Sequence, residues 1–229
     1  MSAIHPQSSR DREAREAYLQ LAEAADEFEQ YAHPHAVRIA AIADALGEAF
    51  HLAPQDRKVL RTAARMHDLG ELAMEREYIK RAGSLTEEER IDLQRHPVIG
   101  EQEAARAGAD RAVQLLVRWH HEWWNGGGYP DALTQTEIPF AARILRVADS
   151  YAALTDIRPY RPAMSEERAR TLLAQRAGIE FDPAIVSAFF SLGDRDELRS
   201  FAKPEVDAEP PAETTSPDDG WDLFSSFMK

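Results

Sequence analysis

The sequence predicts an all-α protein. Long stretches are rich in the strong helix formers Ala, Glu, Leu and Gln, and apolar residues recur at the spacing of one helix face. Neither a series of alternating strands nor an internal repeat at a fixed period is found. The 229 residues, 44% hydrophobic and 29% charged, suffice for one large domain with a sizeable core, with or without appendages.

The first helices are predicted from composition and from the positions of proline. Residues 11–31 contain neither Gly nor Pro, so they favour one continuous helix. Pro34 and Pro54 suit the first positions of the next two helices, because the missing N–H of proline costs nothing there. Gly70 is expected to end the second of these.

The remaining helices follow from caps and apolar periodicity. Ser84 is interpreted as an N-cap before an acid-rich first turn, and Pro97 opens the helix after that. Four more helices are predicted, over residues 109–121, 139–154, 165–177 and 182–192.

The chain is expected to divide into a polar start (1–10), a helical domain (11–200) and an acidic tail (201–229). Residues 204–229 hold seven acids and one lysine, and this composition buries too little apolar surface to become ordered. Aromatic residues return among the acids at 218–228, which is the composition of a peptide that docks into a basic groove of a partner protein. A tail that merely adds solubility has the same composition.

Several classes of protein are disfavoured by the composition. The net charge of −13 argues against general binding of DNA or RNA, whose phosphates attract basic surfaces. No apolar run is long enough for a membrane span, and no secretion signal is found. Cysteine is absent, which excludes disulfides and thiolate metal sites, so a cytoplasmic location is expected. The helix at 11–31 could pack on the core or form a homodimer.

Seven side chains that can bind metal are distributed over the predicted helices: His35, His67, Asp68, His96, His120, His121 and Asp149. Imidazole and carboxylate ligands suit Fe, Mn and Zn. Asp68 has two carboxylate oxygens and could bridge two ions, which together could activate water and hold a phosphoryl oxygen. For His5, His33 and His51 we keep the simpler interpretation of a polar core or surface histidine.

Short motifs surround these residues. The chain carries His-Asp-Leu-Gly at 67–70, His-Pro-Val-Ile-Gly at 96–100, His-His-Glu-Trp-Trp-Asn-Gly-Gly-Gly-Tyr-Pro at 120–130, Ala-Arg-Ile-Leu-Arg-Val-Ala-Asp at 142–149 and Arg-Pro-Tyr-Arg at 158–161. In this combination the motifs are highly specific. Over about residues 30–192 the chain resembles the HD-GYP family, a branch of the HD-domain metal-dependent phosphohydrolases.

The resemblance implies an HD-domain-type helical bundle with a dinuclear metal site, in which two divalent ions, Fe and/or Mn, support hydrolysis of cyclic di-GMP to the linear dinucleotide and/or GMP. By position it assigns one ion to His35, His67, Asp68 and Asp149. It assigns the other to His96, His120 and His121, with Asp68 bridging. Arg158 and Arg161 would hold phosphate oxygens through their forked donors, and Tyr129 would contact the substrate.

Four positions depart from the family's pattern. Glu71 stands where members usually have lysine, so it belongs with His67 and Asp68 among the catalytic candidates. A carboxylate at this position should repel the phosphate, which could cost on the order of several kcal/mol of transition-state stabilisation. In the alternative interpretation, the Glu71 side chain points away from the phosphate or binds metal. Tyr31 replaces a glutamate that recruits a third ion in some members, which favours two ions. Asn125 and Ala152 replace common aspartates, and Asn125 can still accept hydrogen bonds in its turn.

Three functions remain open from the sequence. The full ligand set favours a dinuclear cyclic di-GMP phosphodiesterase. Glu71 favours a catalytically weak relative that serves as a binding or regulatory module. A third alternative is a phosphohydrolase that acts on another cyclic dinucleotide or a nucleotide.

Overall fold

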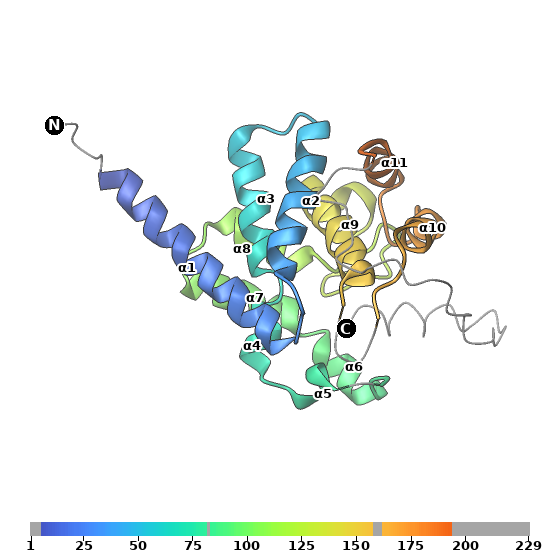
Figure 1. Cartoon of the computed structure of the whole chain (residues 1–229), viewed down its shortest axis with the longest axis horizontal. Coiled ribbons are helices and arrows are strands. Elements are labelled where there is room, and N and C mark those ends of the chain that lie inside the picture. Colours follow the sequence, from blue (N-terminus) through green and yellow to red (C-terminus); the bar gives the residue numbers. More distant parts are fainter. Residues whose placement is uncertain (1–5, 82, 158–161, 194–229) are drawn as a thin grey trace.

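The computed structural model describes residues 6–81, 83–157 and 162–193, and all regular structure in these ranges is helical (Figure 1). The predicted all-α class is therefore confirmed. The elements are α1 (Pro6–Phe28), α2 (His35–Ala49), α3 (Pro54–Met66), α4 (Leu69–Met74), α5 (Glu77–Lys80), α6 (Glu87–Leu93), α7 (His96–Arg106), α8 (Arg111–Trp119), the short 3-10 helix η1 (Gln135–Glu137), α9 (Phe140–Thr155), α10 (Glu166–Arg176) and α11 (Pro183–Ser191).

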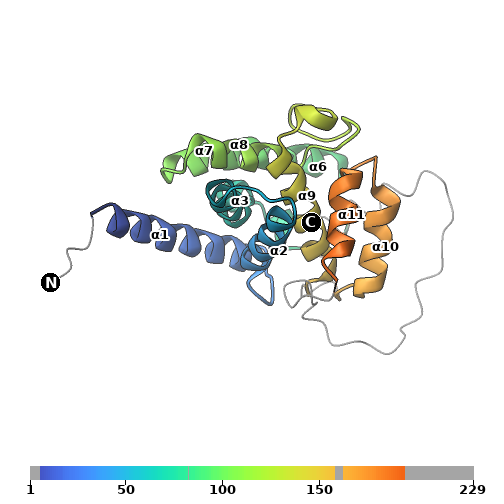
Figure 2. The ribbon, with the colours of Figure 1, turned by 90° about the horizontal axis from the view of Figure 1, so that it is seen from above.

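The core lies where α2, α3 and α9 pack together, with α8 against α3 and α9 (Figure 1). The largest fully buried side chains include Ile39 and Leu46 of α2, Leu60 of α3, and Leu145 and Tyr151 of α9. Helix α9 is buried on nearly every face, because α10 and α11 cover the side that α2 and α3 leave open (Figure 2). None of the described helices is long and apolar enough to cross a membrane.

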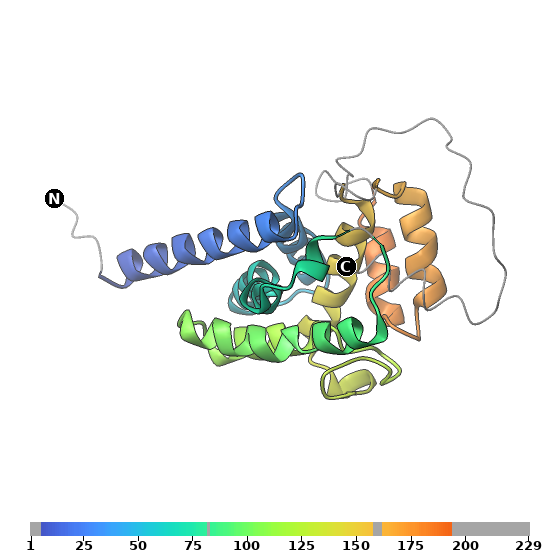
Figure 3. The same ribbon diagram turned by 90° about the horizontal axis from the view of Figure 1, so that it is seen from below.

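Helix α1 packs against α3 and α4 and projects beyond the rest of the protein at its N-terminal end (Figure 3). It begins at Pro6, earlier than the predicted residue 11. It ends at Phe28, because the chain turns at Gln30, whose φ is 64°. Both carboxylate oxygens of Asp26 then accept from the backbone N–H of Ala36, at 3.1 and 3.2 Å. Helix α1 thus supplies the cap for the start of α2, which carries the first predicted metal ligand.

The prediction that Gly70 ends the third helix is wrong. Helix α3 already ends at Met66, and Gly70 lies inside the short helix α4. A β-carbon at Gly70 would be 1.9 Å from the carbonyl oxygen of His96, because α4 packs closely against α7. The glycine is needed there for this close approach of two backbones.

The N-cap of helix α6 is Thr86, whereas the sequence predicted Ser84. The Thr86 hydroxyl accepts from the backbone N–H of Glu89 at 3.2 Å, and the Glu89 carboxylate accepts from the backbone N–H of Thr86 at 2.9 Å. This reciprocal pair satisfies two donors at the helix start. The two late helices were predicted to within one or two residues and are capped by Ser165 and Asp182.

Candidate metal centre

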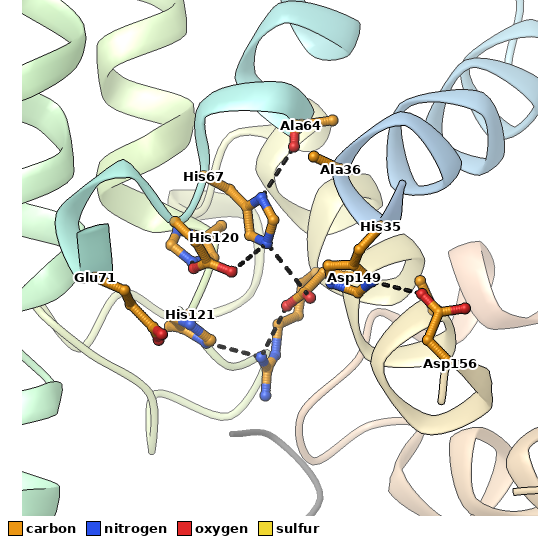
Figure 4. A network of polar contacts seen from close by, with 12 residues as sticks. His35, Ala36, Ala64, His67, Glu71, His120, His121, Asp149 and Asp156 are labelled. Carbon is orange, nitrogen blue, oxygen red and sulfur yellow. Dashed lines mark hydrogen bonds and ion pairs between the residues drawn. The ribbon is translucent and has the colours of Figure 1, made fainter. Parts of the chain in front are cut away.

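The structure brings the seven predicted metal-binding side chains together in two groups. Figure 4 labels five of them, His35, His67, His120, His121 and Asp149, which converge from different helices. Within each group the candidate ligand atoms all lie within 4.8 Å of one another. The first cluster consists of Asp68, His96, His120 and His121, and the second cluster consists of His35, His67 and Asp149. These imidazole and carboxylate groups could hold first-row divalent ions.

The carboxylate of Asp68 faces both clusters. Its Oδ2 lies 2.7 Å from Nε2 of His67 in the second cluster. Its Oδ1 lies 3.6 Å from Nε2 of His96 and 3.7 Å from Nε2 of His120 in the first. One side chain therefore presents a separate oxygen to each cluster, which is the arrangement that a bridging ligand requires.

Most of these side chains lie at helix ends that meet in the interior. His35 and His96 begin α2 and α7, whereas His67 and His120 directly follow α3 and α8. Asp149 comes from the buried helix α9. Residues far apart in the sequence can thus converge without an extended loop in the interior.

Three histidines are oriented by the backbone of the helical turn before them. Nδ1 lies within hydrogen-bonding distance of the carbonyl oxygen three residues earlier: 2.9 Å from His67 to Ala64, 2.8 Å from His96 to Leu93, and 2.6 Å from His120 to Val117. A carbonyl can only accept, so Nδ1 carries the proton in each case. The Nε2 atoms are thereby left to face the clusters, as in metal sites whose outer contacts fix the imidazole.

His35 is oriented by a side chain that the sequence analysis missed. Its Nδ1 lies 2.6 Å from Oδ2 of Asp156, and Arg38 donates to the other oxygen of that carboxylate. Nε2 of His35 is buried and has no hydrogen-bond partner among the described residues. A buried, unpartnered nitrogen beside Asp149 fits a metal ligand. Tyr31 stacks on the ring, with centroids 3.7 Å apart.

The ring of His121 is held differently from the rings of the other four histidines. Its Nδ1 lies 2.8 Å from NH1 of Arg146, a residue that the sequence analysis did not single out. The ring of Tyr129 stacks on the other side, with centroids 4.9 Å apart and planes at 21°. The predicted substrate residue Tyr129 is thus placed directly against the first cluster.

The electrostatics of the two clusters differ. Burial lowers the pKa of His67, but the carboxylates of Asp68 and Asp149 outweigh it and raise this pKa to about 10. Burial raises the pKa of Asp68, and the neighbouring imidazoles, His67 first, then bring it well below its usual value. Burial lowers the pKa of His96 to about 3 and that of His121 well below its usual value, helped by neighbouring positive groups. These two imidazoles are therefore neutral at pH 7, as metal ligation requires.

The glycine-rich segment folds back onto the histidine pair. A β-carbon at Gly128 would be 2.2 Å from the backbone nitrogen of Trp123 and 2.5 Å from the carbonyl oxygen of His121, so only glycine fits. The next residue, Tyr129, donates its N–H to that same carbonyl at 3.2 Å. As expected, Asn125 accepts a hydrogen bond in its turn, from the N–H of Gly127 at 2.9 Å.

The buried carboxylate of Glu122 fixes the far end of this loop. It accepts from the backbone N–H of Asp131 at 2.7 Å and from that of Leu133 at 2.9 Å. The loop is therefore held by a backbone hydrogen bond at Tyr129 and by the Glu122 side chain at Asp131 and Leu133.

Glu71 lies beside the first cluster but belongs to neither cluster. Its side chain is buried, and Oε1 is 3.9 Å from Nδ1 of His96, the nitrogen that already faces Leu93. Figure 4 shows the Glu71 carboxylate near His121. The carboxylate thus lies close to the site, behind one of its histidines. The predicted phosphate ligands Arg158 and Arg161 lie outside the described residues, as does the tail segment 218–228.

Comparison with known proteins identifies the family. A family model described as HD domain matches residues 19–185. A cyclic di-GMP phosphodiesterase of Vibrio cholerae is 34% identical over 63% of this chain and 31% of its own length. A cyclic di-GMP phosphodiesterase response regulator of Xanthomonas campestris pv. campestris is 36% identical over 66% of this chain and 40% of its length. This chain therefore spans less than half of either relative.

Solved structures show the same fold. A cyclic GMP-AMP-specific phosphodiesterase of Vibrio cholerae aligns with a TM-score of 0.61 and 21% identity, over 80% of this chain and 49% of that one. An HD-GYP-type protein of Bdellovibrio bacteriovorus aligns with a TM-score of 0.58 and 19% identity, over 69% of this chain and 51% of that one. Since the family model matches well over half of its residues, the chain belongs to the HD domain family, as the resemblance to the HD-GYP branch predicted.

Proposed function

We propose that this protein is a metal-dependent phosphodiesterase that hydrolyses cyclic di-GMP to the linear dinucleotide and/or GMP in bacterial second-messenger signalling. The observation that carries the proposal is the carboxylate of Asp68, whose two oxygens face two adjacent clusters of candidate ligands. Relatives named as cyclic di-GMP phosphodiesterases support the substrate.

The two clusters would each hold one divalent ion, with Asp68 shared between them. The donors are imidazole nitrogens and carboxylate oxygens, a set that suits Fe and Mn. Bound ions would supply Lewis-acid charge that lowers the pKa of water and neutralises phosphate oxygens. The deep burial of the ligands would exclude bulk water and strengthen these electrostatic effects.

Residues of the chain itself would bind and orient the substrate. Burial raises the pKa of the Tyr129 phenol, and the carboxylates of Glu71 and Asp68 raise it further, so the hydroxyl keeps its proton at neutral pH. A protonated phenol against the first cluster can donate to a phosphate oxygen. Arg158 and Arg161 would hold the phosphates through bidentate hydrogen bonds. The carboxylate of Glu71, 3.9 Å from Nδ1 of His96, would weaken binding of an anion through its nearby negative charge.

Another cyclic dinucleotide is the second candidate substrate. Two relatives from Vibrio cholerae, 28% and 30% identical to this chain, are named as 3'3'-cGAMP-specific phosphodiesterases. The scissile groups of the two dinucleotides are alike, so the same clusters could serve both. Contacts between the protein and the bases would then determine which of the two dinucleotides is preferred.

Turnover of both dinucleotides by anaerobically purified full chain, loaded with Fe(II) or Mn(II), tests the proposal. We expect hydrolysis of cyclic di-GMP, with a smaller kcat/KM for 3'3'-cGAMP. His67→Ala should abolish turnover, whereas His51→Asn, an exposed histidine with positive φ outside both clusters, should leave it unchanged. A protein that binds metal and dinucleotide without turnover would instead be a regulatory module.

Three predictions lie outside the metal centre. We keep the division into a helical domain (11–200) and an acidic tail (201–229) as a proposal, with docking of segment 218–228 on a protein partner. Deletion of 204–229 tests the docking, because it should remove a partner captured by the full chain. Homodimer formation is tested by the mass of the full chain in solution.

A further inference from the structure

Arg146 is a buried basic residue that contacts both clusters. It lies one turn before Asp149 on α9 and is 3% exposed. NH1 is 2.8 Å from Nδ1 of His121 in the first cluster and 3.8 Å from Oδ2 of Asp149 in the second. NH2 donates to the buried carboxylate of Glu180 at 3.1 Å. The guanidinium is thus fixed between one candidate ligand of each cluster and an acid outside both.

The hydrogen bond between Arg146 and His121 has only one direction. A guanidinium has donors and no acceptor, so Nδ1 of His121 must accept. Neutral His121 therefore carries its proton on Nε2, the opposite of the arrangement in His67, His96 and His120. In this state Nδ1 is occupied by Arg146 and Nε2 is protonated, so neither nitrogen of His121 is free to bind an ion.

We propose that Arg146 is a positioning residue that controls metal binding at His121. A divalent ion can bind His121 only after the guanidinium withdraws from its Nδ1, so the first cluster begins with three available ligands and gains His121 last. This inference rests on the proposed metal centre. Its consequence is that the ion in the first cluster is bound less tightly than its four ligands would otherwise allow.

The surroundings of Arg146 permit such a release. Glu180 also lies 3.3 Å from NH1 of Arg176, so its carboxylate is held from a second side and keeps a partner. The bond to Glu180 is made by NH2 and the one to His121 by NH1, so a rotation of the rigid guanidinium about NH2 would withdraw NH1 from His121 and keep the contact with Glu180. The ring of Phe181 lies 5.9 Å from the guanidinium carbon and adds a contact that does not depend on His121.

Two measurements on the full chain test the proposal, and neither uses the substrate. The first is ¹⁵N–¹H correlation of the imidazoles in metal-free protein, which should show His121 protonated at Nε2. The second is calorimetric titration with Mn²⁺. Arg146→Met should raise the affinity of the weaker site by about 10-fold or more, because a charged hydrogen bond no longer competes with the ion.

Arg143→Met is the matched control. Arg143 lies three residues earlier on the same helix, donates to the carboxylate of Asp182 and stacks near the ring of Trp124, but it belongs to neither cluster. Arg143→Met removes one positive charge from α9, as Arg146→Met does. The Mn²⁺ affinity should stay within about 2-fold of that of the natural protein, since Arg143 contacts no candidate ligand. If Arg146→Met does not fold, the double variant Arg146→Met/Glu180→Gln also removes the buried charge of Glu180, which would then have Arg176 as its remaining cationic contact.

The outcomes separate this inference from the proposed function. An Nδ1–H tautomer of His121 in the natural protein would overturn it, and so would equal Mn²⁺ affinities for Arg146→Met and Arg143→Met. Binding of no Mn²⁺ by any variant would overturn both the metal centre and the role of Arg146. A protein that binds Mn²⁺ as expected and hydrolyses no dinucleotide would count against the phosphodiesterase alone.

Discussion

Gly70 lies against the backbone of His96, where a β-carbon would be 1.9 Å from the His96 carbonyl oxygen and 2.8 Å from the backbone nitrogen of Gly100. The contact joins α4, which follows Asp68, to the start of α7, which carries His96. The distance of 3.6 Å between Oδ1 of Asp68 and Nε2 of His96 therefore depends on the absence of one methyl group.

Gly70→Ala should lower the free energy of unfolding by about 3 kcal/mol, because the backbone of α7 has to move to admit the methyl group. Urea unfolding of the metal-free protein measures this change. Gly47→Ala is the matched control, since the nearest neighbours of its β-carbon would be side-chain atoms of Arg57, Leu52 and Leu60, at 3.3, 3.4 and 3.6 Å, and no backbone atom. Its effect should stay within about 1 kcal/mol. Equal losses in the two variants would contradict the explanation.

Glu71→Lys should raise kcat for cyclic di-GMP by about 10-fold or more. The substitution replaces a buried negative charge near the phosphate site with a positive one, and donors aimed at transition-state charge have effects of this size. Steady-state kinetics of the Mn(II)-loaded protein give the result. Glu77→Lys, whose carboxylate is 89% exposed, makes the same charge change at the surface and should have no effect. A lower kcat would show that the carboxylate supports His96.

Metal binding at pH 7.5 should release close to one proton, and that proton comes from His67. Its pKa of about 10 in the metal-free protein lies above the usual 6.5, so it is charged at pH 7.5, whereas a ligand must be neutral. The affinity for Mn²⁺ should therefore rise by about 10-fold per pH unit between pH 7 and 9. Calorimetry in two buffers of different ionisation enthalpy counts the proton. Binding without proton release would mean that His67 is already neutral.

The same raised pKa predicts how the stability of the metal-free protein depends on pH. The contribution of His67 to folding is fully present below pH 6.5, the value in the unfolded chain, and is lost as the pH rises toward about 10. Urea unfolding in the presence of a chelator should show a lower free energy of unfolding at pH 9.5 than at pH 6.5. The His67→Ala variant should not show this difference.

Asp156→Ala should weaken metal binding in the second cluster by about 10- to 100-fold, since it removes the group that orients His35. It also leaves Arg38 buried without this carboxylate, so unfolding should become about 3–5 kcal/mol easier. Metal content and urea unfolding measure the two effects. Asp156→Asn keeps an acceptor for His35 and should lose less of both. Unchanged metal content in Asp156→Ala would contradict the positioning role.

Most of the helices, though not α4 and α5, and the grouping of the seven candidate ligands could be predicted from the sequence because each has a local signal. Pro34, Pro54 and Pro97 mark helix starts, and the histidines stand in short motifs. The role of Gly70 could not be predicted, since glycine between helical segments usually ends a helix, and only the packing of α4 on α7 shows the close contact.

The residues that orient the ligands were harder to find than the ligands. Asp156 follows Thr155 at the end of the helix that carries Asp149, and an acid at this place was the only signal that could have suggested it. Arg146 lies within a quoted motif, but its contact with His121 spans 25 residues and depends on how α9 faces the loop after α8. Such contacts depend on tertiary packing, which the periodicity of apolar residues in the sequence does not predict.

The way the imidazoles are held divides the centre into parts that respond differently to mutation. Main-chain carbonyls align three of the histidines, and these carbonyls remain whatever side chains occupy the anchoring positions, Ala64, Leu93 and Val117. His35 and His121 are instead held by the side chains of Asp156 and Arg146. A substitution of Asp156 would affect His35, and one of Arg146 would affect His121 and the longer contact with Asp149, whereas the three histidines aligned by carbonyls would keep their orientation. Evolution can therefore retune metal affinity at these two positions, while the bundle that carries the centre stays the same.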